Sequence, residues 1–232
     1  MINAFPEAIQ DDVTTLFRLA LGFILLTLLI LLRGLSGTVA TFFMIIMSIM
    51  TAMGLAGWSG IMLSPPAMSA PIMILTRANA DAVHLLVTMR HELAIGKNKE
   101  EAMTESMRIN FRPIFVTSLT TILGFLSLNF SDAPPFHDLG NIASMGVAAA
   151  FIFSITFLPA IVCILPASGK REVAGKQLMV NFGECVIAKQ KLLLVGNILI
   201  ISLLSTFVPL NELNDQFVEY FYETVEFRRD SD

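Results

Sequence analysis

The sequence has 232 residues, of which 55% are hydrophobic and only 15% are charged. Soluble proteins average about 25% charged residues, so this chain is short of what a water-facing surface needs. A net charge of −4 gives no attraction to nucleic acid, and two cysteines are too few for a disulfide scaffold. With a mean hydropathy of +0.72, the composition predicts an all-α polytopic membrane protein.

Six hydrophobic windows approach the roughly 20 apolar residues that a helix needs to cross about 30 Å of hydrocarbon. They are residues 13–32, 38–58, 67–89, 113–130, 139–165 and 191–208. The predicted organisation follows from them: a stub at 1–12, a five-span domain at 13–166, a linker at 167–190, a sixth span at 191–208 and a further segment at 209–232. The acidic last segment is typical of the start of an incomplete extracytoplasmic domain.

The distribution of basic residues predicts the orientation. Positive residues stay on the cytoplasmic side of a membrane, and most lysines and arginines fall in the connections after the first, third and fifth windows. Only Arg228 and Arg229 fall in the predicted outer segment. We therefore expect both termini outside the cytoplasm. The residues on the inner side are Arg33, Arg90, Lys97, Lys99, Arg108, Arg112, Lys170, Arg171, Lys176, Lys189 and Lys191.

The connection after the third window contains helix signals of its own. Gly96 is a typical helix end, and Asn98 followed by Glu101 has the spacing of a capping box. The segment up to Arg112 carries one weakly apolar face. We predict a surface helix that lies on the inner leaflet, as a linker or as a coupling element, with the next span beginning at Pro113.

Polar residues interrupt the third window near its middle. Arg77, Asp81, His84 and Thr88 fall within an arc of roughly 60° on a helix, with Asn79 close by. An ionised aspartate at the membrane centre costs about 2.5–3.5 kcal/mol on insertion scales. This stripe should therefore face the bundle interior. Such residues are typical of proton relays, so Asp81 and His84 are the candidate relay.

A structural alternative uses the same residues. Arg77 and Asp81 are four positions apart, which allows an ion pair within one helix. A fixed positive charge at this distance also stabilises the ionised carboxylate and opposes a protonation cycle. Both the relay and the ion pair stay open, with Arg77 and Asn79 as modulating residues.

The fourth window offers a hydroxyl face. Thr117, Thr120 and Thr121 share one side with Gly124, where they could bond to Asp81 or His84 and line the relay. Small and hydroxylated residues also pack helices in membranes without further chemistry. Packing is therefore the alternative for each of these threonines.

Motifs of enzymes and metal sites are missing from the sequence. His91 and Glu92 begin a pattern like HExxH, but Ile95 stands where the second histidine ligand should be. There is no GxSxG, P-loop or CxxC motif. We expect no enzymatic activity, no metal and no cofactor.

A long series of motifs resembles one half of a transporter of the RND superfamily, in its MMPL-like hydrophobe exporter branch. The same block is similar to a sterol-sensing domain, and the segment from Phe217 to Arg229 resembles the start of the family's second periplasmic domain. The matching stretches run from Ala80 to Leu86, Asn110 to Pro113, Thr117 to Thr121, Gly124 to Leu128, Asp132 to Phe136, Asp138 to Gly140 and Leu158 to Ala160.

The resemblance implies a function and a place in a longer transporter. By the family template this chain corresponds to spans two to seven of twelve, in a bacterial cytoplasmic membrane. Asp81 takes the place of the family's relay carboxylate and His84 has the branch's usual spacing, whereas Arg77 and Asn79 replace small or apolar residues. The implied activity is proton-coupled export of a lipid-like or hydrophobic substrate.

The expected partners follow from this activity: membrane lipids, the substrate, protons, and either the missing transporter portions encoded nearby or further copies of the chain. Nucleic acid is not expected. Two alternatives stay open. One is a lipid- or sterol-sensing module that binds without transport, and the other is a non-transporting remnant or assembly subunit.

Overall fold

The computed structural model describes residues 4–32, 34–165 and 176–207, with side chains described from residue 14 onward apart from 176–180 and 183. These residues form helices and turns, and none of them lies in a strand. The all-α prediction is confirmed. The helices are α1 (Ala4–Leu32), α2 (Leu35–Trp58), α3 (Ala70–Ala94), α4 (Lys99–Leu126), α5 (Pro134–Ile155), α6 (Phe157–Ile164), α7 (Lys176–Ala188) and α8 (Gln190–Ser205), with short 3-10 helices η1 (Ala67–Ser69) and η2 (Ser127–Phe130).

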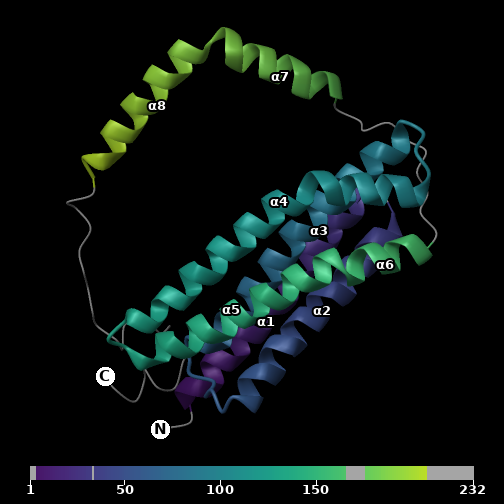
Figure 1. Ribbon diagram of the computed structural model, residues 1–232. Helices are drawn as coiled ribbons and strands as arrows, with labels where there is room; N and C mark the ends of the chain where they lie inside the picture. The colour runs from purple at the N-terminus through teal and green to yellow at the C-terminus, as the bar shows by residue number, and fades with distance from the viewer. Residues whose placement is uncertain (1–3, 33, 166–175, 208–232) are drawn as a thin grey trace. The chain divides into compact units, whose positions relative to one another are not determined.

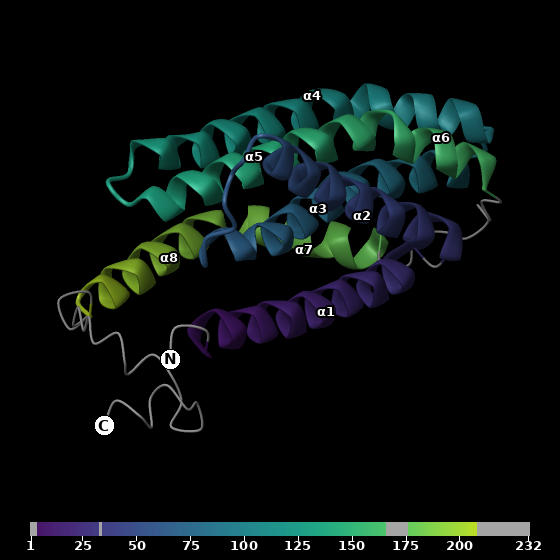
Figure 2. The ribbon, with the colours of Figure 1, turned by 90° about the horizontal axis from the view of Figure 1, so that it is seen from below.

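The helices up to α6 form one compact unit of the chain, and α7 and α8 belong to a second. In the first unit α3 packs against α1, α2, α4 and α5. Figure 1 shows α4 alongside α5, and Figure 2 shows α1 at one edge of this unit, with α2 and α3 between it and α4. The helix α3 therefore has protein neighbours on most of its sides.

Within the described residues, five segments are long and apolar enough to cross a membrane. They correspond to the first five predicted windows and are Thr14–Leu32, Leu35–Trp58, Ala67–Ala94, Lys99–Phe130 and Pro134–Ile164. The helix found in the sixth window, α8, is shorter than the predicted span of 191–208, because it has 16 residues. At 1.5 Å per residue this helix spans about 24 Å, less than the hydrocarbon core. The predicted segment 209–232 lies outside the described residues. So do residues 1–3 of the stub and 167–175 of the linker, and the side chains of residues 4–12 are not described.

The turn between α3 and α4 confirms the predicted helix end and capping box, but not the predicted surface helix. Gly96 has a φ of 97° after the end of α3, and Asn98 and Glu101 form both hydrogen bonds of a capping box. The separate surface helix is wrong, because α4 continues through Pro113 from Lys99 to Leu126. Its first turns are apolar enough on one face to be buried in the bundle, where Ala102 is fully enclosed.

The fifth window contains a break between two helices. The helix α5 ends at Ile155, and α6 begins at Phe157. Proline has no N–H, and its ring collides with the carbonyl four residues earlier. Pro159 stands four residues after Ile155, so it accounts for the interruption. Across the bundle, Lys99 Nζ donates hydrogen bonds to the carbonyl oxygens of Cys163, at 2.8 Å, and Leu165. This joins the start of α4 to the end of α6.

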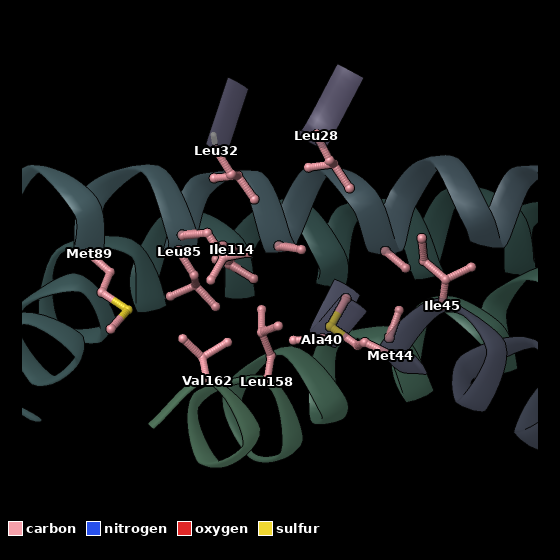
Figure 3. Close-up of a cluster of buried hydrophobic side chains, with 14 of the residues drawn as sticks. Leu28, Leu32, Ala40, Met44, Ile45, Leu85, Met89, Ile114, Leu158 and Val162 are labelled. Atoms are coloured by element: carbon pink, nitrogen blue, oxygen red, sulfur yellow. The ribbon is translucent and has the colours of Figure 1, made fainter. Parts of the chain in front are cut away.

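A buried hydrophobic cluster holds the first unit together. Its side chains come from α1 to α6, and Figure 3 shows many of them converging, among them Leu28 of α1, Met44 of α2 and Leu158 of α6. Leu85 of α3 and Ile114 of α4 complete this layer and are 1% exposed. Lipid is as apolar as these side chains, so close packing rather than water exclusion stabilises such contacts in a membrane.

Glycine allows the closest approach between α4 and α5. A Cβ atom at Gly140 would lie 2.4 Å from the carbonyl oxygen of Phe125, whereas a Cβ at Gly124 would meet nothing within 4 Å. The backbone of α5 thus lies directly against the end of α4. This contact holds the end of α4 against the start of α5.

We expect Gly140→Ala to destabilise the protein by about 1–3 kcal/mol, because the added methyl group overpacks a backbone contact. The matched control is Gly124→Ala, which gains helix propensity of up to about 1 kcal/mol and should be neutral or stabilising. Thermal unfolding of both variants in detergent micelles measures the difference. Equal effects of the two substitutions would contradict the close contact.

Candidate functional site

The candidate site is centred on Asp81, near the middle of α3. The helix runs from Ala70 to Ala94, so Asp81 lies about 16 Å along it at 1.5 Å per residue. The residue is 0% exposed. The sequence forms a helix here because its polar residues are interspersed with alanine, leucine and isoleucine, and Ala78 and Ala82 leave room for close neighbours. A carboxylate is thereby enclosed within an apolar membrane-spanning segment.

Arg77 lies one turn before Asp81 and forms the ion pair that the spacing allowed. Its Nη2 atom is 2.9 Å from Asp81 Oδ1, and the side chains of Arg77 and Asp81 are 16% and 1% exposed. The same nitrogen donates to Thr117 Oγ1 at 2.7 Å and to Ser118 Oγ at 3.0 Å on α4. One guanidinium nitrogen therefore contacts a carboxylate of its own helix and two hydroxyls of the next.

The pair is incompletely satisfied. Among the described residues, Arg77 Nε and both Asp81 oxygens are buried without a hydrogen bond of acceptable geometry, although Oδ1 is within ion-pair distance of Arg77. Buried polar groups are normally paired, and an unpaired one costs about 1–3 kcal/mol. The carboxylate thus has unused capacity to accept a hydrogen bond or a proton.

The other polar residues of α3 do not share one environment. His84 is exposed, Asn79 is half-buried with its Oδ1 atom enclosed and unbonded, and Thr88 accepts a 2.9 Å hydrogen bond from Asn110 Nδ2. The expectation that the whole stripe faces the interior therefore holds for Asp81 and not for His84. The relay role of both residues stays a prediction.

The threonines of α4 differ from one another in their contacts. Thr117 accepts the hydrogen bond from Arg77 and donates one to the carbonyl oxygen of Pro113 at 2.9 Å. Thr120 and Thr121 donate to carbonyl oxygens of their own helix, those of Val116 at 2.9 Å and Thr117 at 2.6 Å. Only Thr117 of the three has a hydrogen bond to α3 in the described structure. A relay-lining role for Thr120 and Thr121 stays a prediction.

The sequence reasoning missed three polar residues on the buried face of α4. Ser118 is 1% exposed and bonded to Arg77, Asn110 is bonded to Thr88, and Ser106 Oγ donates to the carbonyl oxygen of Leu85 at 2.6 Å. A signal was available, because small or polar residues recur on this face at every fourth position. The series is Ala102, Ser106, Asn110 and Ser118, interrupted by Ile114.

Comparisons with known proteins identify relatives of this arrangement. The model of the MMPL family matches residues 1–181. The chain is 29% identical over 99 residues to a hopanoid transporter, HpnN, of Rhodopseudomonas palustris, a match that covers 43% of this chain and 11% of the relative. It is 28% identical over 94 residues to a putative membrane protein of Streptomyces coelicolor, SCO0839, covering 40% and 13%.

A third relative is a putative membrane protein of Methanocaldococcus jannaschii, MJ1562, with 26% identity over 82 residues, 35% of this chain and 21% of the relative. The matched segments are thus a small part of each relative's length. The family match, by contrast, covers α1 to α6.

The ion pair generates a prediction about stability. Arg77→Gln should destabilise the protein by about 3–5 kcal/mol, because it leaves a buried carboxylate unpaired. The double variant Arg77→Gln/Asp81→Asn should recover most of this loss, since neither remaining side chain is charged. Chemical unfolding in micelles measures both, with the exposed Thr76→Ala as control. A double variant no more stable than Arg77→Gln would contradict a buried pair.

The position of His84 is tested by thiol labelling in a background with Cys163→Ala and Cys185→Ala. We expect His84→Cys to react rapidly with a small membrane-permeant thiol reagent in detergent, because its side chain is exposed. Ala82→Cys, at a fully buried position, is the control and should react slowly. Similar rates at both positions would show that His84 faces the interior.

Proposed function

Because this chain belongs to the MMPL family, we propose that it forms the membrane domain of an RND-type transporter that couples proton entry to export of a lipid-like or hydrophobic substrate. The family match supports the assignment as the membrane domain of such a transporter. Proton coupling, substrate class and direction are the proposal. It extends to the location, a bacterial cytoplasmic membrane with both termini outside the cytoplasm.

The observation that carries the proposal is the enclosed carboxylate of Asp81. Placing an ionised aspartate at the centre of a spanning helix costs about 2.5–3.5 kcal/mol on insertion scales, and such residues mark ion or proton pathways by default. Asp81 is 0% exposed, and both its oxygens lack a hydrogen bond of acceptable geometry. A carboxylate in this setting can take up a proton at an unbonded oxygen and lose its charge.

The surrounding residues support different roles. His84 is exposed about one turn further along α3, and its imidazole can both accept and donate a proton, so we assign it the exchange of protons with Asp81. Thr117 lies at the guanidinium of Arg77, and Thr88 at the amide of Asn110. Of the threonines predicted to line the relay, these two bond across the α3–α4 interface in the proposed path.

The substrate class rests on the relatives and on the membrane setting. One relative is named a hopanoid transporter, and hopanoids are hydrophobic lipids. A protein whose described spans lie among lipids meets such a substrate directly. The partners in this proposal are membrane lipids, the substrate and protons, together with transporter portions beyond this chain or further copies of it.

A non-transporting role is the second candidate, and the Arg77–Asp81 distance of 2.9 Å favours it. In that case the two charges neutralise each other permanently and serve to hold α3 against α4. The two candidates differ in one measurable property, which is whether Asp81 ever carries a proton.

We expect Asp81→Asn to abolish proton movement in proteoliposomes that hold a pH-sensitive dye and a fluorescent polycyclic lipid analogue. Wild-type protein should dissipate an imposed pH gradient faster when the analogue is present, and the variant should match protein-free vesicles, because an amide cannot carry the proton. The control is Ser48→Ala, a buried hydroxyl of α2 that bonds only to its own helix at Met44. Unchanged, analogue-dependent proton movement in Asp81→Asn would remove Asp81 from the mechanism.

A further inference from the structure

We propose that Arg77 is a positioning residue that transmits the charge state of Asp81 to the part of α4 beyond Pro113. This rests on the proposed function in one respect, the uptake of a proton by Asp81. With the carboxylate ionised, Arg77 holds it and the α4 hydroxyls together. With the carboxylate neutral, Arg77 loses its counter-ion and releases the outer segment of α4.

The geometry of the bridge comes from a single atom. Arg77 Nη2 lies 2.9 Å from Asp81 Oδ1, 2.7 Å from Thr117 Oγ1 and 3.0 Å from Ser118 Oγ. An amino group of this kind has two hydrogens, so three acceptors compete for them. A change in the charge of the carboxylate therefore changes the strength of both bonds to α4.

Pro113 divides α4 into two segments with separate attachments to α3. Before the proline, Ser106 bonds to the carbonyl oxygen of Leu85 and Asn110 bonds to Thr88. After the proline, Thr117 and Ser118 bond to Arg77. A proline inside a helix removes one backbone hydrogen bond and is a site of bending. The hydrogen bonds of the segment before Pro113 to α3 are thus independent of Asp81, while those of the segment after Pro113, the outer segment, are made by the partner of Asp81.

Arg77 is the charged group that acts on Asp81 from close range. The helix α2 carries no titratable residue, and the described side chains of α1 include one, the exposed Arg18. The other titratable groups on the packed helices are His84 on α3 with Arg90, His91 and Glu92 at its end, those of α4 from Lys99 to Arg112 before Pro113, and His137 and Asp138 in the first turns of α5. The bridge therefore responds mainly to the proton on Asp81.

The proton step is a simple exchange. A proton from water binds to one carboxylate oxygen of Asp81, and the site changes from a neutral pair to a net charge of +1. The guanidinium is then attracted more weakly to Asp81 and gains by moving toward water through its 16% exposed side. When the proton leaves, the ion pair and both hydroxyl contacts form again.

Two measurements on the full-length chain in lipid nanodiscs test this. Infrared difference spectra between pH 8 and pH 5 report the carbonyl stretch of a protonated carboxylic acid, which Asp81→Asn assigns. Spin labels at Met50→Cys on α2 and Leu123→Cys on α4 report the distance to the outer segment, in a background with Cys163→Ala and Cys185→Ala. Both labelled positions are exposed.

In wild-type protein we expect the Asp81 band to appear at pH 5 together with a distance change of about 1–2 Å, the usual size of helix shifts. A control pair, Met50→Cys with Ile109→Cys, should not change, because Ile109 precedes Pro113. The variant Thr117→Val/Ser118→Ala keeps the Arg77–Asp81 pair but removes its contacts on α4. It should keep the infrared band and lose the distance change, and so should Arg77→Gln.

If Arg77→Gln fails to fold, Arg77→Gln/Asp81→Asn replaces it and should show one distance at both pH values. The inference is overturned if the band appears without a distance change, or if the change persists after removal of the hydroxyls. Absence of the band in wild-type protein overturns the proposed proton uptake, and the bridge with it. These outcomes separate failure of the bridge from failure of the proposed function.

Discussion

The structure depends on the requirement that a charged group inside an apolar span find a partner. Asp81 meets it through Arg77 on its own helix, and Arg77 in turn requires acceptors that only a neighbouring helix can supply. Thr117 and Ser118 provide them, which brings α4 against α3. The small residues of the same α4 face and Gly140 of α5 then allow the close packing of the remaining helices.

Hydropathy and local motifs predicted much of the fold. The first five spans, the turn at Gly96 and the capping box at Asn98 each depend on residues close in sequence, so their signals are local. The continuity of α4 through Pro113 could not be predicted in this way. A proline after charged residues has the pattern of a helix start, and the burial of Ala102 is decided by tertiary packing against distant helices.

The site was predictable to the extent that helical periodicity determines it. A spacing of four residues brought Arg77 and Asp81 together as expected. Periodicity places residues on one face of a helix, but it does not say how far neighbouring helices cover that face. His84 is therefore exposed, although its angle around α3 is close to that of Asp81. For α4, the choice between Thr117 and Ser118 as the inward residue depended on how the helix is rotated, which long-range contacts decide.

An ion pair and a proton carrier are often treated as exclusive roles for one aspartate, but the partial exposure of Arg77 removes that conflict. If Asp81 were the sole partner of Arg77, its protonation would leave a buried guanidinium without any acceptor, at a prohibitive cost. Here the side chain of Arg77 is 16% exposed, so water can replace the carboxylate as its acceptor when Asp81 is neutral. The carboxylate can therefore change its charge without leaving the guanidinium unpaired, while the contacts with Thr117 and Ser118 are released.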